Sequence, residues 1–100
     1  MKRTNEIVKD IESFTEIGRI CRDRAAGRTV YCLFREAADA NRFRIRVTDD
    51  GACEEGALSG SLSQVTTLFE RIAAGDVPPY ILHEILEDYQ KENALILANI

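Results

Sequence analysis

The sequence of 100 residues contains no tryptophan, one histidine and two prolines, and it has no long apolar run. A membrane-spanning helix needs roughly 18 consecutive apolar residues, so we expect no membrane partner. The basic start, Met1–Glu6, is followed by charged residues at positions 9, 10 and 12 instead of an apolar segment. A signal peptide would need that apolar segment, and we therefore expect a cytoplasmic protein.

Clustered metal ligands and cofactor-binding loops are missing as well. The three cysteines, Cys21, Cys32 and Cys53, form no CxxC pair, and His83 is the one histidine. A structural zinc site normally needs about four ligands, and an odd number of unclustered cysteines is typical of reduced intracellular thiols. The sequence has no glycine-rich phosphate loop and no recognisable catalytic constellation. We therefore predict no metal, no cofactor, no catalytic residues and no enzymatic activity.

The chain contains enough apolar material for one core. Its apolar fraction is 45% and its charged fraction is 30%, both ordinary for a globular domain. A chain of this length does not divide well into two cores, so we expect a single domain over residues 1–100. Residues 1–50 carry eleven basic and nine acidic side chains, whereas residues 51–100 carry two basic and eight acidic ones. The first half is therefore net positive and the second half is strongly negative.

The clearest periodicity in the chain lies at residues 42–48. Phe43, Ile45 and Val47 alternate with three arginines, and such alternation predicts a half-buried antiparallel strand. Residues 4–14 fit two structures, because their apolar positions have helical spacing but also tolerate a strand. We leave that segment open between helix and strand.

Three further stretches favour strands. Residues 29–35 are rich in β-branched and aromatic side chains. Residues 15–22 fit a strand better than a helix because Gly18 disfavours a helix, and a weaker strand is expected over 55–61. The first two are joined by a turn in which Gly27 supplies a positive φ. The sheet should therefore contain three or four antiparallel strands over residues 15–61.

The second half of the chain changes to helical periodicity. Ser61 and Gln64 have the spacing of a capping box, which predicts a helix over 62–74 that ends at a left-handed Gly75. Two prolines then open a second helix over 79–92. Because strands come first and helices follow, we predict an α+β fold in which a C-terminal helical hairpin packs on one face of the sheet.

The last third of the chain also resembles a known family. The matching residues form a serine-rich bend, a short helix, a Val-Pro-Pro step and a second helix with an acidic pair: Ser61-Leu62-Ser63, Val65, Leu68, Val77-Pro78-Pro79, Leu82, Ile85-Leu86 and Glu87-Asp88. They resemble a group of short uncharacterised Firmicutes proteins that is classed as a domain of unknown function. Pro78 stands where that family more often has a threonine. The resemblance implies the same fold and a bacterial cytoplasmic setting, without any activity or ligand.

A stripe of arginines is the sharpest functional feature. Arg42, Arg44 and Arg46 share one face of the predicted strand and stand about 7 Å apart. We call them the arginine stripe, and we regard it as a candidate site for phosphates, acidic peptides or nucleic acid. The alternative, which we favour, is an exposed sheet face whose arginines pair with carboxylates on neighbouring strands. Nucleic acid is not the expected partner, because Tyr31 is the only candidate aromatic residue for stacking on bases.

Two other groupings have ordinary explanations that we favour. If residues 26–27 form a two-residue turn, Cys21 faces Cys32 at a distance that permits a disulfide. Buried free thiols are the more common outcome. The acidic residues of the second helix are neighbours at i, i+3 and i+4 and are expected to form a solvated face, not a metal site: Glu84, Glu87 and Asp88.

These observations favour a small intracellular interaction module whose partner is another protein or a second copy, as in a homodimer. The contact would be made by a sheet edge or by the apolar tail 94–100, which is unusual for a free terminus. The candidate interface residues in this tail are Leu95, Ile96, Leu97 and Ile100. The alternative function is binding of an anionic ligand or nucleic acid by the arginine stripe.

Overall fold

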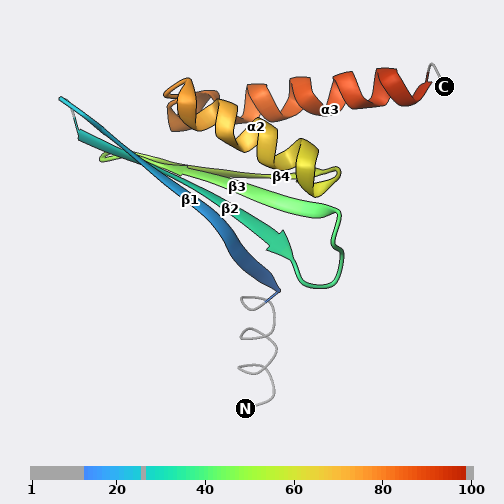
Figure 1. Cartoon of the computed structure of the whole chain (residues 1–100). Helices are drawn as coiled ribbons and strands as arrows, with labels where there is room; N and C mark the ends of the chain where they lie inside the picture. Colours follow the sequence, from blue (N-terminus) through green and yellow to red (C-terminus); the bar gives the residue numbers. More distant parts are fainter. Residues whose placement is uncertain (1–12, 26, 99–100) are drawn as a thin grey trace, which may run out of the picture.

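A computed structural model describes residues 13–25 and 27–98, with side chains up to Glu92. Residues 4–12 of the ambiguous segment lie outside this description, and Phe14 belongs to the first strand. The described elements are β1 (Phe14–Arg24), β2 (Gly27–Glu36), β3 (Arg42–Thr48), β4 (Cys53–Ser59), α2 (Leu62–Ala74), the 3-10 turn η1 (Pro79–Ile81) and α3 (Leu82–Ala98). The predicted α+β class is confirmed, since an antiparallel sheet is followed by two C-terminal helices (Figure 1).

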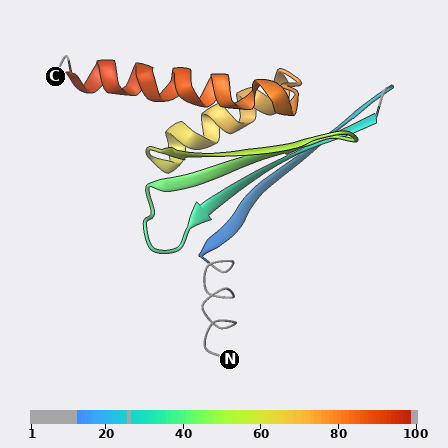
Figure 2. The ribbon, with the colours of Figure 1, turned by 180° about the vertical axis from the view of Figure 1, so that it is seen from behind.

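The sheet has one face covered by helices. Its strands pair in the order β1-β2-β3-β4, each antiparallel to the next. The apolar residues of β3 face the core as the alternation predicted, since Phe43, Ile45 and Val47 are at most 1% exposed. Figures 1 and 2 show α2 and α3 on the same side of the sheet. We call the opposite side, toward which the arginine stripe points, the open face.

The β1–β2 hairpin is longer than predicted and has a different register. Pairing continues to Arg24 and Gly27 at the turn, and Gly27 has the predicted positive φ, at 141°. Cys32 pairs with Arg19 instead of with Cys21. The predicted register was wrong because the pair that closes the hairpin lies one residue earlier on each strand than a turn at 26–27 would require. The two cysteines therefore do not face each other, and both are free.

Strand β4 lies two residues earlier than the predicted 55–61. It ends at Ser59 because Gly60 adopts a φ of 156° and turns the chain toward α2. Gly56, in the middle of the strand, lies against Leu86 of α3. A Cβ atom at Gly56 would overlap Leu86 Cδ1 of α3, so the glycine permits close contact between helix and strand.

Helix α2 has the predicted bounds and the predicted capping box. The Gln64 backbone N–H donates to Ser61 Oγ, and the Ser61 backbone N–H donates to Gln64 Oε1, both at 3.1 Å. The left-handed residue after the helix was predicted wrongly: Gly75 has a φ of −83°, and Asp76 has a φ of 54°. Aspartate tolerates this conformation better than most residues, and Arg22 Nε lies 3.1 Å from its carboxylate.

The second helix is longer than the predicted 79–92. One 3-10 turn begins at Pro79, and α3 then continues to Ala98. Part of the segment predicted as an apolar tail is therefore helical backbone, and the end of α3 projects past the strands (Figures 1 and 2). The side chains of the candidate interface lie outside the described residues: Leu95, Ile96, Leu97 and Ile100.

The hydroxyl of Tyr31 is buried in the core between sheet and helices and is hydrogen-bonded there. Tyr31 is fully buried, and its hydroxyl donates a hydrogen bond of 2.9 Å to the Val77 carbonyl oxygen. We expect Tyr31→Phe to lower the free energy of unfolding by about 1 kcal/mol, because it removes this bond and leaves the carbonyl without that donor. Urea unfolding followed by circular dichroism measures the effect. An unchanged midpoint would mean that the hydrogen bond does not stabilise the fold.

Candidate functional site: the open face and the two sheet edges

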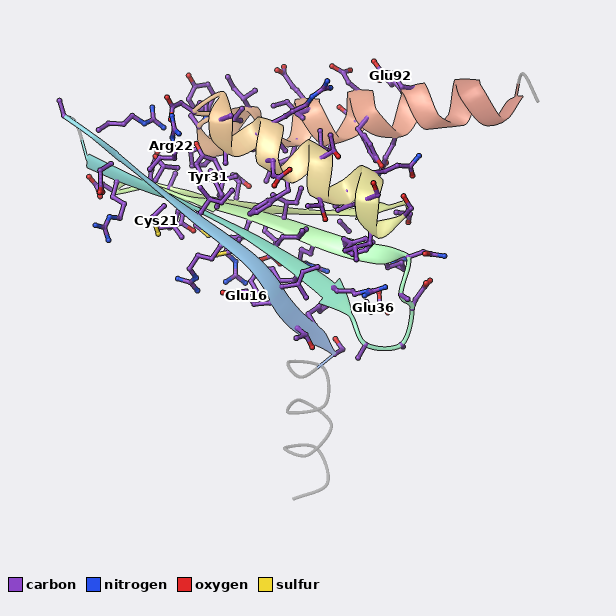
Figure 3. The ribbon with its side chains drawn as sticks, viewed as in Figure 1. Glu16, Cys21, Arg22, Tyr31, Glu36 and Glu92 are labelled. Carbon is purple, nitrogen blue, oxygen red and sulfur yellow. The ribbon has the colours of Figure 1, made fainter. Side chains whose placement is uncertain are left out.

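The open face combines side chains from all four described strands. The pairing places Glu16 beside Phe34, which lies beside Arg44 of the stripe. In Figure 3, Glu16 and Cys21 lie on the open face, whereas Tyr31 lies on the helix side. Tyr31 was predicted as the candidate for stacking on bases, and its complete burial in the core contradicts that role.

The arginine stripe is paired with carboxylates on neighbouring strands. Glu55 of β4 accepts hydrogen bonds from Arg44 Nη1 at 2.6 Å and from Arg46 Nε at 2.8 Å. Arg42 Nε lies 3.2 Å from a carboxylate oxygen of Glu36 on β2. Burial alone would raise the pKa of Glu55, but its hydrogen bonds with Arg44 and Arg46 hold that pKa below its usual value. The stripe therefore has the neutralised arrangement that we favoured from the sequence.

Two phenylalanines fill the spaces between these arginines. Arg44 Cζ lies 4.7 Å from the Phe14 ring centroid, and Arg46 Cζ lies 4.9 Å from the Phe34 ring centroid. Each guanidinium is thus held by a ring as well as by a carboxylate. Sequence reasoning missed both rings, because they come from β1 and β2 and reach the stripe only through strand pairing. The pairing of β2 with β3 places Phe34 directly opposite Arg44, and sequence reasoning did not assign that register.

The remaining arginines of the open face are also paired. Arg19 Nη2 lies 2.8 Å from Glu16 Oε1, and Arg28 Nε lies 2.7 Å from Asp23 Oδ1. These pairs are solvent-exposed and contribute little to stability. Their importance is electrostatic, because positive and negative groups alternate across this face of the described sheet.

All three cysteines lie on or beside the open face. Cys21 and Cys53 are exposed, whereas Cys32 is 5% exposed between Arg19 and Arg46 of the neighbouring strands. Burial raises the pKa of the Cys32 thiol, so its reactive thiolate is disfavoured. Cys21, in contrast, occupies the edge strand β1 with an accessible side chain.

Helix α3 covers the β4 edge of the sheet. Gln90 Nε2 donates to the Ala57 carbonyl oxygen of β4 at 3.2 Å, and Leu86 packs over Gly56. His83 Nε2 lies 3.2 Å from Glu54 Oε2, with both side chains exposed. An uncovered strand edge recruits other strands, and the bond from Gln90 occupies one backbone acceptor of β4.

The β1 edge has no such cover within residues 13–25 and 27–98. β1 is bonded to β2 on one side, and no described group hydrogen-bonds to the backbone of its outer side. A groove of about 470 Å³ runs between β1 and α2, with Phe69 among its lining residues. Ile17 and Leu62 line it and are 43% and 45% exposed. The two sheet edges thus differ, because α3 bonds to the backbone of β4 whereas no described group bonds to the outer backbone of β1.

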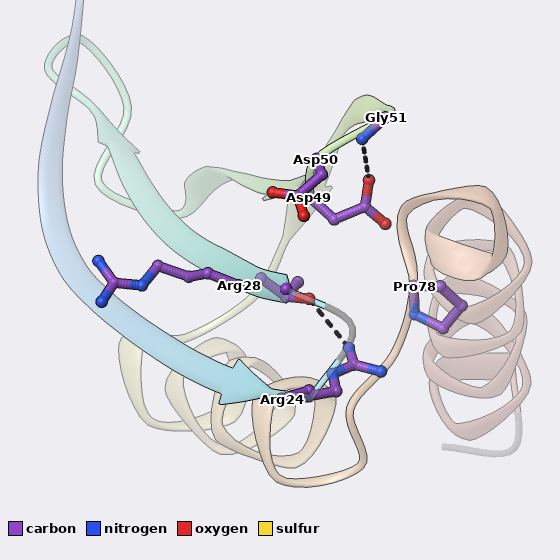
Figure 4. A pocket seen from close by; sticks show the side chains of 8 residues that line it. Arg24, Arg28, Asp49, Asp50, Gly51 and Pro78 are labelled. Carbon is purple, nitrogen blue, oxygen red and sulfur yellow. Dashed lines mark hydrogen bonds between the residues drawn. The ribbon is translucent and has the colours of Figure 1, made fainter.

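Figure 4 shows a polar hollow at the end of the sheet that carries the β1–β2 turn. Its volume is about 330 Å³, and Arg24 and Asp49 are among its lining residues. Arg24 Nη2 donates to Thr29 Oγ1 at 2.9 Å, and Asp49 Oδ1 accepts from the Gly51 N–H at 3.0 Å. Arg24 and Asp49 are therefore engaged within the protein itself and do not form a free ligand site.

The acidic residues of α3 stay on its exposed surface: Glu84, Glu87 and Asp88. Across the described part of the chain, no group of three acidic, cysteine or histidine residues is placed to hold a metal ion. Nor is any helix in that part long and apolar enough to cross a membrane.

No protein family, curated protein or solved structure matches the chain, so the resemblance to the Firmicutes family stays a prediction.

Proposed function

We propose that this protein is a cytoplasmic interaction module without enzymatic activity, and that its partner is a second copy of itself. The observation that carries this proposal is the difference between the two sheet edges. At β4, Gln90 of α3 donates a hydrogen bond to the Ala57 carbonyl oxygen, and Leu86 packs over Gly56 on the helix-covered face, whereas no described group bonds to the outer backbone of β1. An unpaired strand edge presents backbone donors and acceptors to another chain.

The arginine stripe supports this proposal over binding of a free anion. A phosphate would have to compete with Glu55 for Arg44 and Arg46, and with Glu36 for Arg42. Arginine and phenylalanine, which the open face combines, are instead both enriched in protein interfaces. A nucleic-acid or metabolite partner for the stripe is therefore the weaker of the two functions.

The absolute mass in solution tests the proposal. Light scattering on a sizing column should give twice the chain mass of 11.2 kDa, and the mass should fall toward that of one chain on dilution. A chain that ends at Asn93 lacks the candidate interface residues of the tail but keeps Gln90. It therefore distinguishes a contact through the tail from a contact through the β1 edge. We expect it to remain a dimer, because the β1 edge is intact. Loss of the dimer on truncation would show that the contact lies at the end of α3. A full chain that is monomeric at every concentration would refute self-association.

A further inference from the structure

We propose that two copies pair antiparallel through β1, with Cys21 on the two-fold axis and Arg19 of each copy opposite Asp23 of the other. This proposal rests on the proposed self-association and names its contact surface and register. The result would be one continuous sheet that spans both copies, since each β1 lies between its own β2 and the second β1. Antiparallel pairing about a two-fold axis gives both copies the same contacts.

The regular part of β1 sets the centre of the pairing. A register shift interrupts β1–β2 pairing between Glu16 and Gly18, and the remaining pairs run without interruption to Arg24. Irregular residues of this kind bend an edge strand and disfavour further pairing there. The regular stretch therefore extends from Gly18 to Arg24, and its central residue is Cys21.

The charges on β1 favour the same centre. With Cys21 on the axis, Arg19 lies directly opposite Asp23 of the second copy, and the reverse contact forms as well. Moving the axis to Arg19 or to Arg22 would place two like charges directly opposite each other, which is unfavourable in a sheet. An axis at Ile20 avoids that repulsion but places Arg19 opposite Cys21, without an opposite charge.

Both members of the new ion pair are available for contact. The side chains of Arg19 and Asp23 are 56% and 73% exposed. Their present partners, Glu16 and Arg28, lie on the same open face, so they would extend the row of alternating charges across the axis. In Figures 1 and 2 both helices lie on the other face of the sheet, and the contacts that close an edge come from α3 at β4.

Cross-linking of Cys21 tests the register. Directly opposed residues have Cα atoms about 4.5–5.5 Å apart, so a short bis-maleimide should join two copies through Cys21. We expect the covalent dimer with the full chain and with Cys53→Ser, and its loss with Cys21→Ser. Because Cys53 is the other exposed thiol, Cys53→Ser is the matched control. A cross-link that required Cys53 instead would overturn the proposal.

Charge reversal tests the same contact without a reagent. Arg19→Asp places two acidic residues opposite each other at both symmetric sites, and Asp23→Arg places two basic residues there. Each single change should weaken the dimer about tenfold or more, and the double change should restore it. Circular dichroism of each variant controls for loss of fold. If both single variants dimerise like the wild type, the register is refuted.

The outcomes separate this proposal from the broader one. If the protein is a dimer but shows no Cys21 cross-link and no response to charge reversal, the proposed self-association stands and the proposed β1 register is refuted. A chain that stays monomeric over the whole concentration range refutes both. A dimer whose charge-reversed double variant recovers, while each single variant does not, supports both.

Discussion

Replacing Gly56 by valine is expected to lower the free energy of unfolding by about 2–3 kcal/mol, because the added side chain cannot fit under α3. A Cβ atom at this position already overlaps Leu86 Cδ1. Leu86 is 4% exposed, so it has little room to move aside. Relief of the overlap requires Leu86 to leave its rotamer in the core or α3 to shift away from β4, and a shift would also weaken the bond from Gln90 to the Ala57 carbonyl.

Gly51 provides the matched control, since a Cβ atom there meets no heavy atom within 4 Å. Gly51→Val should change the free energy of unfolding by less than about 0.5 kcal/mol. Urea unfolding of both variants measures the difference. We further expect Gly56→Val to form species larger than a dimer on a sizing column, because the β4 edge becomes available for pairing. Equal stability of the two variants would show that α3 is not tightly fixed on β4.

Replacing Glu55 by glutamine is expected to have the second-largest effect, and it acts on the arginine stripe. The carboxylate accepts hydrogen bonds from Arg44 and Arg46 at once, and an amide cannot replace both because its nitrogen donates. We expect a loss of about 1–2 kcal/mol in the free energy of unfolding near neutral pH. The change also removes the negative charge that these two arginines share.

The effect should depend on pH in a defined direction. Hydrogen bonds from the two arginines outweigh burial and hold the pKa of Glu55 below its usual 4.5 in the folded protein. A carboxylate with a lowered folded-state pKa contributes stability that is fully present above its unfolded pKa and is lost as the pH falls through the folded value. The difference between wild type and Glu55→Gln should therefore shrink below about pH 4.5. A difference that stays constant into acid would contradict the ion-pair explanation.

The Glu55→Gln variant also tests whether the arginine stripe binds anions. The wild type should show no affinity for a labelled mixed-sequence oligonucleotide at low salt, whereas Glu55→Gln should gain weak, salt-sensitive binding. Glu54→Gln is the control, because Glu54 precedes Glu55 on β4 but contacts His83 instead of the stripe. Fluorescence anisotropy separates the cases. Strong binding by the wild type would restore the anion-binding function that the pairing disfavours.

The sequence predicted the features that depend on local pattern. Strict alternation identified β3, and the Ser61–Gln64 capping box identified α2, with the observed bounds in both cases. Both signals are contained within a few neighbouring residues, so tertiary contacts changed neither of them. The predicted pairing of the stripe with neighbouring carboxylates also agrees with the ion pairs of Glu55 and Glu36.

Features that depend on contacts between strands could not be derived in this way. A shift of one residue in the closing pair of the β1–β2 hairpin moved Cys32 opposite Arg19. Phe14 and Phe34 meet the stripe only after three strands pair in the correct register. The closed β4 edge likewise depends on Gln90, more than thirty residues after Ala57. Turn composition and periodicity contain no information about such distant partners.

Residue-resolved amide hydrogen exchange over a dilution series tests the central claim most directly. If β1 pairs with a second copy, its amides that face the outer edge should be protected at high concentration and lose this protection on dilution. The amides of β4 should exchange at the same rate throughout, since α3 of the same chain covers that edge. Exchange of the β1 amides that does not vary with concentration would contradict pairing of this edge with a second copy.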